Sequence, residues 1–441
     1  MIDVRSLRED PKPFYDSCRA RGFDVSVLDS FFDLDRRWRE NSRRLNELKH
    51  SKNVITAQVA QAVKSGGDAE ALREKVKGIN GEIEQLEREQ EAIERERDRV
   101  LRMIPNLIHS SVPVCFGDDN NVVVRSWGVA KVCREDEGYM RANGGGMEYE
   151  IIEKRPRSHV DILPELNLVD LERAAKIAGS RFYFIKNRLL KLELALINYA
   201  IDFLSERGFS VVEPPFMLNL ESMSGATDIE TFRDTLYKIE GEDLYLISTS
   251  EHPIASMFSG EFLEERDLPM RVAGLSACFR REAGSHGKDT KGIFRVHQFN
   301  KVEQFVFCRE DQSWEFLEEI LNNAETIYRN LGIPYRVVNV CSGELGRLAA
   351  KKYDIEAWFP AQGRFREVVS ASNDTDYQAR ALSIKYRSSE GNKFVHTLNS
   401  TAVATTRTLV AIVENFQRDD GKVIEVPKVL VPYTGFDHIG E

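Results

Sequence analysis

The sequence predicts an α+β protein in which a strand-containing body follows a long pair of N-terminal helices. Apolar residues recur at heptad spacing through residues 31–104, which is typical of a helical coiled coil. Alternating apolar and polar residues flank a charged loop between residues 272 and 307, which is typical of an antiparallel hairpin. The two periodicities occupy different parts of the chain, so we expect separate domains.

Length and composition limit the possible functions. The chain has 441 residues, enough for two or three domains, and 42% of them are hydrophobic. No apolar run approaches the roughly 18 residues that a membrane helix needs. The N-terminal segment has no apolar signal region, so the cytoplasm is the expected location. The net charge of −10 disfavours non-specific nucleic-acid binding, so no DNA partner is expected and any RNA contact requires a local basic patch.

The cysteines are scattered along the chain without any CxxC pair. This spacing argues against a disulfide framework or a zinc site, and we expect buried thiols. The residues are Cys18, Cys115, Cys133, Cys278, Cys308 and Cys341.

The N-terminal region contains two heptad seams, one from Phe31 to Val59 and one from Leu72 to Ile104. Residues 65–68 (SGGD) predict a turn in which Asp68 caps the second helix, so the helices should fold back as an antiparallel pair. About 30 residues at ~1.5 Å per residue give an arm about 45 Å long. An arm of that length suits contact with a distant partner.

Basic residues gather in the distal half of this arm, whereas residues 82–96 make the proximal part of the second helix acidic. Such an asymmetry suits a phosphate backbone held near the tip. The alternative is that these side chains form only the solvated face of a coiled coil. The candidate RNA-binding residues are Lys49, Lys52, Lys64, Arg73, Lys75 and Lys77.

Residues 279–303 carry arginines and carboxylates around a glycine-containing loop. If the flanking strands continue into the loop, Arg280 and Glu282 share one face. The return strand would align Arg295, His297, Phe299, Lys301 and Glu303. A guanidinium there can hold a phosphate, and Phe294 or Phe299 can stack on a purine. The alternative is a charged hairpin with cross-strand ion pairs.

This segment resembles the second signature motif of class II aminoacyl-tRNA synthetases, because FRRE at 279–282 is followed by R-x3-F-x3-E. Residues 292–303 (GIFRVHQFNKVE) resemble the seryl-tRNA synthetases in particular. Other motifs follow in that family's order: residues 208–217 resemble the dimer-forming first motif, residues 249–251 the TxE serine loop, and residues 367–380 with 396–417 the segment of the third motif. The N-terminal arm resembles the arm with which this family holds the long variable arm of its tRNA.

The resemblance implies a class II synthetase-like antiparallel β-sheet flanked by helices, with an N-terminal antiparallel coiled-coil arm. It implies a tRNA-binding domain at residues 1–104, with the arm at about 27–104, and a homodimeric catalytic domain at residues 105–441. The three motifs would lie at about 208–217, 279–303 and 396–417.

The resemblance also implies an activity: L-serine reacts with ATP in the presence of Mg²⁺, and the seryl group passes to the 3′ end of tRNA(Ser). tRNA(Sec) stays open as a further acceptor. Catalysis would depend on positioning and charge stabilisation, without a covalent nucleophile. One alternative is a paralogue that loads a carrier other than tRNA, which the long arm disfavours. The other is an inactive RNA-binding scaffold, which the intact motif residues disfavour.

Site residues follow from their positions in the motifs. The catalytic residues would be Arg280 and Arg407. Mg²⁺, which prefers hard oxygen ligands, would be held by Glu367 and Ser370. The serine site would contain Thr249, Ser250, Glu251, Arg280, Glu303 and Thr401. The ATP site would contain Arg280, Arg281, Glu282, Arg295, Val296, Phe299, Glu367, Val368, Val369, Ser370 and Arg407.

Overall fold

The computed structural model describes residues 1–282 and 291–440, and the chain divides into two compact units. One unit comprises residues 2–105. The other begins at Asn106 and also includes Met1.

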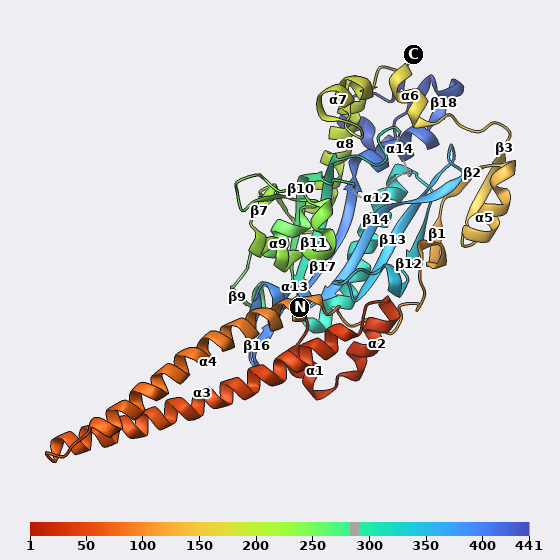
Figure 1. Cartoon of the computed structure of the whole chain (residues 1–441). Coiled ribbons are helices and arrows are strands. Elements are labelled where there is room, and N and C mark those ends of the chain that lie inside the picture. Colours follow the sequence, from red (N-terminus) through yellow and green to blue (C-terminus); the bar gives the residue numbers. More distant parts are fainter. Residues whose placement is uncertain (283–290, 441) are drawn as a thin grey trace. The chain divides into compact units, whose positions relative to one another are not determined.

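The N-terminal unit consists of helices: α1 (Val4–Glu9), α2 (Lys12–Arg21), α3 (Ser26–Lys64) and α4 (Glu70–Met103). The two long helices α3 and α4 pack along each other as the predicted antiparallel pair (Figure 1). Every predicted seam position is buried or half-buried, and Leu45, Leu48 and Ile83 form a small apolar core. Polar interruptions of the seam also make contacts across it, since the Asn41 amide donates to the Leu86 carbonyl at 3.2 Å.

A tight turn separates the two long helices. Gly66 adopts a φ of 71°, which glycine tolerates without strain. The carboxylate of Asp68 accepts a hydrogen bond from the Glu70 N–H at 2.9 Å and so satisfies one of the free N–H groups at the start of α4. The role predicted for Asp68 is therefore confirmed.

The other unit is built on a sheet that, within residues 106–282 and 291–440, has eight strands in the order β1-β12-β13-β14-β17-β11-β10-β6. In this sheet β6 pairs with β10 in parallel, and the pairs from β1 to β10 are antiparallel. The predicted α+β class is confirmed. The strands are β1 (Val122–Trp127), β6 (Ser210–Val212), β10 (Met270–Phe279), β11 (Gln298–Cys308), β12 (Tyr335–Asn339), β13 (Lys351–Phe359), β14 (Arg364–Thr375) and β17 (His396–Ala404).

Long amphipathic helices cover one face of this sheet: α8 (Asn187–Ser205), α12 (Ser313–Leu331) and α14 (Thr405–Asn415). Their apolar sides join the strands in the main hydrophobic core. The stripe Leu189, Leu192, Leu196 and Tyr199 of α8 is buried in that core. Because this face is filled by helices, the opposite face of the sheet carries the polar residues considered below.

Shorter elements surround this layer. Helices are α5 (Glu137–Asn143), α6 (His159–Glu165), α7 (Leu171–Ala178), α9 (Leu220–Ala226), α10 (Ile229–Phe232), α11 (Glu251–Ser256), α13 (Tyr377–Ala381) and α15 (Val431–Thr434). Small sheets pair β2 (Val129–Cys133) with β3 (Glu148–Ile152), β4 (Val169–Asp170) with β5 (Phe184–Ile185), β7 (Met217–Leu218) with β8 (Tyr245–Leu246), β9 (Phe262–Glu264) with β15 (Lys385–Ser388) and β16 (Gly391–Phe394), and β18 (Gln417–Arg418) with β19 (Val423–Glu425) and β20 (His438–Gly440).

Residues 168–204 are largely helical but contain two separate helices. Helix α7 ends at Ala178, and Gly179 follows with a φ of 94°, a conformation that α-helices do not contain. The chain then forms β5 before α8 begins.

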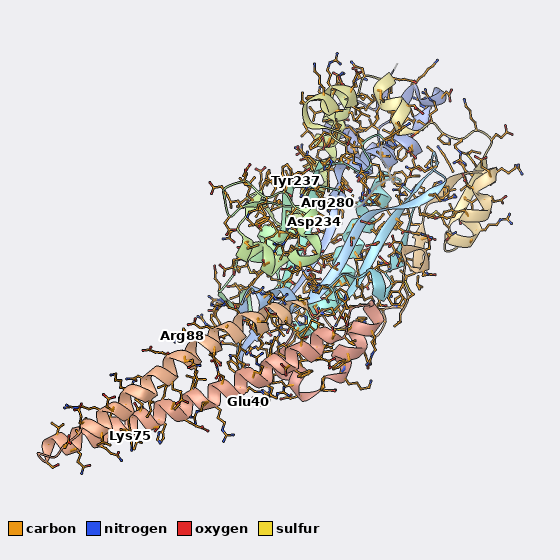
Figure 2. The ribbon with its side chains drawn as sticks, viewed as in Figure 1. Glu40, Lys75, Arg88, Asp234, Tyr237 and Arg280 are labelled. Atoms are coloured by element: carbon orange, nitrogen blue, oxygen red, sulfur yellow. A yellow bond between two sulfur atoms is a disulfide. The ribbon has the colours of Figure 1, made fainter. Side chains whose placement is uncertain are left out.

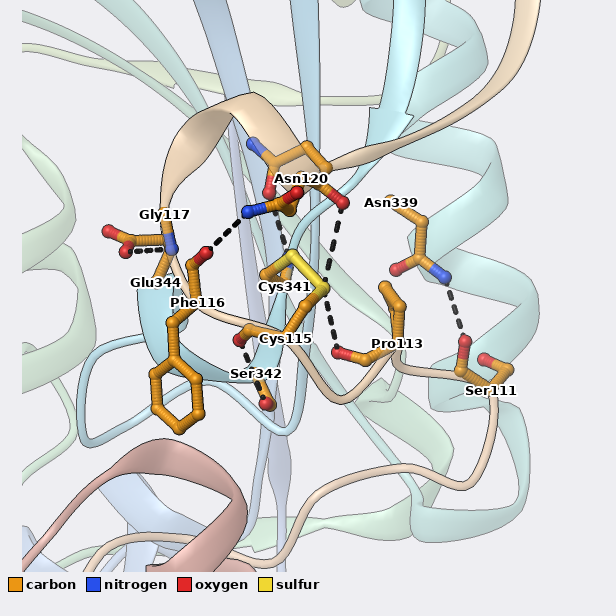
Figure 3. Close-up of a disulfide and its surroundings, with 11 residues drawn as sticks. Ser111, Pro113, Cys115, Phe116, Gly117, Asn120, Asn339, Cys341, Ser342 and Glu344 are labelled. Carbon is orange, nitrogen blue, oxygen red and sulfur yellow. Dashed lines mark hydrogen bonds between the residues drawn. A yellow bond between two sulfur atoms is a disulfide. The ribbon is translucent and has the colours of Figure 1, made fainter.

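The structure corrects the expectation that all cysteines are buried thiols. Cys115 and Cys341 form a disulfide with their Cα atoms 5.1 Å apart, across a sequence separation of 226 residues (Figure 3). Cys18, Cys133, Cys278 and Cys308 are free and buried, as expected. The spacing of the cysteines could not predict this disulfide, because the two bonded cysteines are far apart in the sequence and no short motif links them.

In the described residues, no helix is both long and apolar enough to cross a bilayer, as the composition predicted.

Candidate active site

The hairpin predicted around residues 272–307 is present as β10 and β11, paired from Met270–Phe307 to Phe279–Gln298. The loop segment 283–290 lies outside the described residues. The strands end earlier than predicted, because the ladder stops at Phe279 and Glu282 adopts a φ of 51°. Arg280 and Glu282 therefore do not share a strand face. Glu282 instead forms an ion pair with Arg295 at 3.1 Å on the other side of the loop.

A polar cavity of about 380 Å³ opens beside this hairpin. Its wall combines arginines with a group of carboxylates, a mixture that can bind a polyphosphate together with its cation. The lining residues are Asp118, Asp119, Asn121, Tyr139, Phe294, Arg295, Arg336, Asp354, Glu356, Phe365, Arg366, Glu367 and Arg407. The predicted residues Arg295, Glu367 and Arg407 thus meet in one place.

Arg407 is fixed at the start of α14, directly after β17. Its Nη1 donates to the Glu367 carbonyl at 2.9 Å and to the Glu367 carboxylate at 3.1 Å. It also lies 5.3 Å from the ring centre of Phe294, which Arg366 approaches at 4.3 Å. Phe294 is buried between these cations, so it supports the arginines and offers little free surface to a purine.

Glu367 and Ser370 reach the same face of β14 because of a bulge. The register shifts between the pairs Ile355–Val369 and Glu356–Glu367, which leaves Val368 as the extra residue. Val368 and Val369 both point into the core in consequence. A regular strand would have turned two residues three positions apart to opposite faces.

Carboxylates of β13 complete this part of the wall. Asp354 lies opposite Ser370 and Glu356 lies opposite Glu367. Burial raises the pKa of Asp354 to about 7, although Lys352 opposes this. Burial acts on Glu367 in the same direction, but Arg407 and Lys352 outweigh it and lower the pKa of that carboxyl.

The predicted serine residues meet in a second, more buried group. Thr249, Ser250, Glu303 and Thr401 are each at most 7% exposed. Glu303 faces Thr401 across β11 and β17, where a register shift follows Val302, and the Thr401 hydroxyl donates to the Glu303 carboxylate at 3.4 Å. Lys301 holds the same carboxylate at 2.5 Å. A hydroxyl and a carboxylate are thus poised together in a space that suits a small polar ligand.

Glu251 closes this group from another element. Thr249 and Glu251 follow β8, which ends at Leu246, and Glu251 is the first residue of α11. The Gln378 amide donates to the Glu251 carboxylate at 2.9 Å. Burial, with further contributions from Asp374 and Glu303, raises the pKa of Glu251 to about 8. An ammonium group of a ligand would stabilise the charged form of this buried carboxyl, because a nearby opposite charge offsets the cost of burial.

Ser250 has a structural contact of its own. Its hydroxyl donates to the Gly274 carbonyl of β10 at 3.1 Å. A side chain at position 274 would collide with Ser250 and Ile254, so the close contact requires glycine there. Ser250 therefore fixes the start of α11 against the sheet.

Arg280 follows β10 directly (Figure 2). Its guanidinium lies 5.2 Å from the ring centre of Phe299. Its charge acts on Glu367 in the cavity and also on His252 in α11, whose pKa burial lowers to about 3 with help from Lys301 and Arg280. The charge of Arg280 therefore influences groups in both places.

Some of the predicted ATP residues lie apart from the cavity. Val296 is buried, and Arg281 is exposed and bonded through its N–H to the Thr235 carbonyl. Phe299 lines a separate cavity of about 200 Å³ with Phe182 and Asn300. These residues can contribute backbone atoms or ring faces, but their side chains do not share the wall formed by Glu367 and Arg407.

The candidate RNA-binding residues lie on the arm. Lys49 forms an ion pair with Glu87 at 2.8 Å, and Lys52 is half-buried at the seam. Lys64, Arg73, Lys75 and Lys77 are exposed. Lys75 lies close to the turn of the helix pair, whereas Glu40 and Arg88 lie farther from it (Figure 2).

Sequence reasoning missed several residues of the cavity. Asp354 and Glu356 alternate along β13 and could have been found from the spacing Y-D-I-E, which places two carboxylates on one strand face. The segment that contributes Asp118, Asp119 and Asn121 carries no recognisable sequence motif. The disulfide holds this loop, and the Asn121 side chain accepts from the Cys341 N–H at 2.9 Å.

Comparisons with known proteins agree with this geometry. Residues 235–416 match the "tRNA synthetase class II core domain (G, H, P, S and T)", and residues 1–108 match the "Seryl-tRNA synthetase N-terminal domain". The chain is 68% identical over 440 residues to the serine–tRNA ligase of Thermoplasma acidophilum and 65% identical to that of Picrophilus torridus, covering 100% of this chain and 99% of each relative. The chain belongs to the seryl-tRNA synthetase family.

Solved structures of the seryl-tRNA synthetase family are also similar to this chain over its full length. The seryl-tRNA synthetase of Pyrococcus horikoshii, complexed with ATP, superposes with a TM-score of 0.95 at 48% identity. The cytoplasmic serine–tRNA ligase of Naegleria fowleri, in complex with AMP, gives a TM-score of 0.84 at 40% identity. Each similarity covers 100% of this chain and 99% of the other. The class II fold expected from the motifs is therefore confirmed.

Proposed function

We propose that this chain is a serine–tRNA ligase that activates L-serine with ATP and transfers the seryl group to tRNA(Ser). Family membership over the full length supports this activity. The observation that carries it is the polar cavity on whose wall Arg295, Glu367 and Arg407 meet. It is accompanied by the buried, hydrogen-bonded pair of Glu303 and Thr401.

Serine fits the buried group by its charges and its hydroxyl. Glu251 would hold the α-ammonium, and the bonded pair of Glu303 and Thr401 would bind the side-chain hydroxyl. A site built to bond a hydroxyl disfavours alanine, because alanine leaves the polar groups of the site unpaired. Arg280 would then face the serine carboxylate and the α-phosphate that this carboxylate attacks.

ATP fits the cavity as its polyphosphate partner. Arg407 at the start of α14 would hold the terminal phosphates after releasing Glu367, to which it is bonded here. Arg280 would stabilise the charge that develops on the α-phosphate as pyrophosphate leaves. No side chain of the chain needs to form a covalent intermediate.

The carboxylate of Glu367 and the hydroxyl of Ser370 are the oxygen donors that Mg²⁺ prefers, and the bulge at Val368 turns both toward one face. When bound, the ion neutralises phosphate charge. We assign the metal site to these two residues.

The proposal extends to partners. The exposed lysines and arginine of the arm would bind the tRNA backbone, and the catalytic unit would form a homodimer through α8 and β6, which expose Leu190, Leu194 and Val211. The cytoplasm is the compartment in which such an enzyme would meet tRNA and ATP.

The test is amino-acid-dependent ATP–pyrophosphate exchange by the purified protein with serine, threonine, alanine or glycine, with and without Mg²⁺. We expect exchange with serine that depends on Mg²⁺. Exchange with a different amino acid would overturn the assignment of Glu303 and Thr401, and an absence of exchange would favour the scaffold alternative.

A further inference from the structure

We propose that Asp354 is a positioning residue for the divalent cation: it orients the Ser370 hydroxyl toward the metal and accepts a hydrogen bond from a metal-bound water. This inference rests on the proposed function, because it concerns the cation that accompanies ATP. It adds a residue that the motif pattern did not suggest.

The first support is the pairing of β13 with β14. Asp354 and Ser370 are directly opposite each other in the register. Hydrogen bonding to the Ser370 side chain lowers the pKa of Asp354, against the larger effect of burial. A hydroxyl has one proton and two lone pairs. Once its proton is committed to Asp354, its lone pairs are free for a ligand in the cavity.

The second support is the unequal pairing of the three carboxylates on this wall. Glu356 has an ion pair with Arg336 at 2.5 Å, and Glu367 has one with Arg407 at 3.1 Å. Asp354 is only 7% exposed, and Lys352 approaches its Oδ2 no closer than 3.9 Å. Its Oδ1 is buried without a hydrogen-bond partner in the part of the chain that the structure describes.

A buried carboxylate oxygen without a partner is costly, so a donor from outside the protein is expected there. Mg²⁺ keeps several of its waters when it binds to protein, and those waters are strong donors. Asp354 lines the same cavity as Glu367, which we assign as a direct ligand. Its carboxylate therefore suits the shell of groups that surrounds and orients the metal ligands.

The competing explanation is purely structural: Asp354 could serve only to hold β13 against β14. A metal measurement separates the two. Mn²⁺ is the probe, and its free concentration is followed by electron paramagnetic resonance in the presence of the full-length protein and α,β-methylene-ATP. The variants are Asp354→Asn, which keeps the shape and an acceptor oxygen, and Asp354→Ala, which removes both.

We expect Asp354→Asn to weaken Mn²⁺ binding about 10-fold and Asp354→Ala by more, within the roughly 10- to 100-fold range of such groups. The matched control is Asp35→Asn, because Asp35 is also buried but pairs with Arg8 and Arg39 in the N-terminal helices and does not line the cavity. The control should leave Mn²⁺ affinity unchanged. Thermal melting of each variant shows whether it is folded at the temperature of the titration.

A double-mutant cycle tests the route through Ser370. If Asp354 acts by orienting that hydroxyl, the effects of the two mutations are not independent. Adding Asp354→Ala to the Ser370→Ala variant should then weaken Mn²⁺ binding less than adding it to the wild-type protein. Strict additivity would overturn the route.

Unchanged Mn²⁺ affinity in both Asp354 variants would overturn the whole inference, provided that the wild-type protein shows serine-dependent exchange. Wild-type protein without exchange would instead contradict the proposed function, so the two failures are distinguishable.

Discussion

At the scale of single residues, Arg280 is the side chain on which both halves of the candidate site depend. Arg280→Ala should lower serine-dependent exchange by at least about 100-fold, because it removes a preorganised cation from the developing charge. The measurement is the steady-state exchange rate. The control is Arg271→Ala in β10, the strand that precedes Arg280, since Arg271 is paired with Glu319 at 2.9 Å. Near-normal exchange by Arg280→Ala would remove it from the catalytic residues.

Glu251 makes the site sensitive to pH. Its pKa is raised to about 8 by burial and by neighbouring carboxylates, so at pH 6 the group is protonated and cannot neutralise an ammonium. We expect kcat/KM for serine to rise with pH between 6 and 8, by up to about tenfold per unit. Exchange kinetics over this range measure it, with KM for ATP as the internal comparison. A flat serine profile would show that Glu251 does not bind the ammonium.

At the scale of elements, the arm should matter for tRNA and not for adenylate formation. Replacing the exposed Lys64 and Lys75 by Glu should spare ATP–pyrophosphate exchange and weaken tRNA charging about 10-fold or more at moderate salt, since phosphate contacts dominate such binding. The control is Arg36→Glu, at the other end of α3, where Arg36 contacts Asp33. If the double variant charges tRNA normally, the lysines are only the solvated face of the helix pair.

The bulges of β14 and β17 are also features of elements. Strand alternation places Glu367 and Ser370 on opposite faces, and only the extra residue at Val368 brings them together. The resemblance to the family named both residues as a metal-binding pair, although no periodicity in the sequence predicts the bulge. The structure thus supplies the physical reason for the spacing of the motif.

At the scale of the whole molecule, the proposed homodimer has a defined candidate surface. Leu190 and Leu194 on α8 are 40% and 51% exposed, which is unusual for leucines on a long helix that packs on a sheet. Leu190→Asp/Leu194→Asp should convert the protein to a monomer in sedimentation velocity. Val63→Asp, at an equally exposed position on the arm, should leave the mass unchanged. A monomeric wild-type protein would contradict the proposal.

The sequence by itself determined the N-terminal helix pair, the β10–β11 hairpin and the identity of the motif residues. Heptad spacing is a local property, so it predicted the helix pair, its turn and the role of Asp68 without a structure. Alternation along strands likewise predicted the β10–β11 hairpin. Motif resemblance selected Arg280, Glu303, Glu367 and Arg407, and all four lie at the two polar groups.

Only the tertiary structure decided how distant segments meet. The Cys115–Cys341 disulfide joins residues 226 positions apart, and Asp354 faces Ser370 because β13 and β14 pair in one register. Glu251 reaches the serine group from a helix, and the left-handed conformation of Glu282 ends the strand that alternation would have continued. These features depend on packing and on register across the sheet, which are set by contacts between segments rather than by the order of residues within one segment.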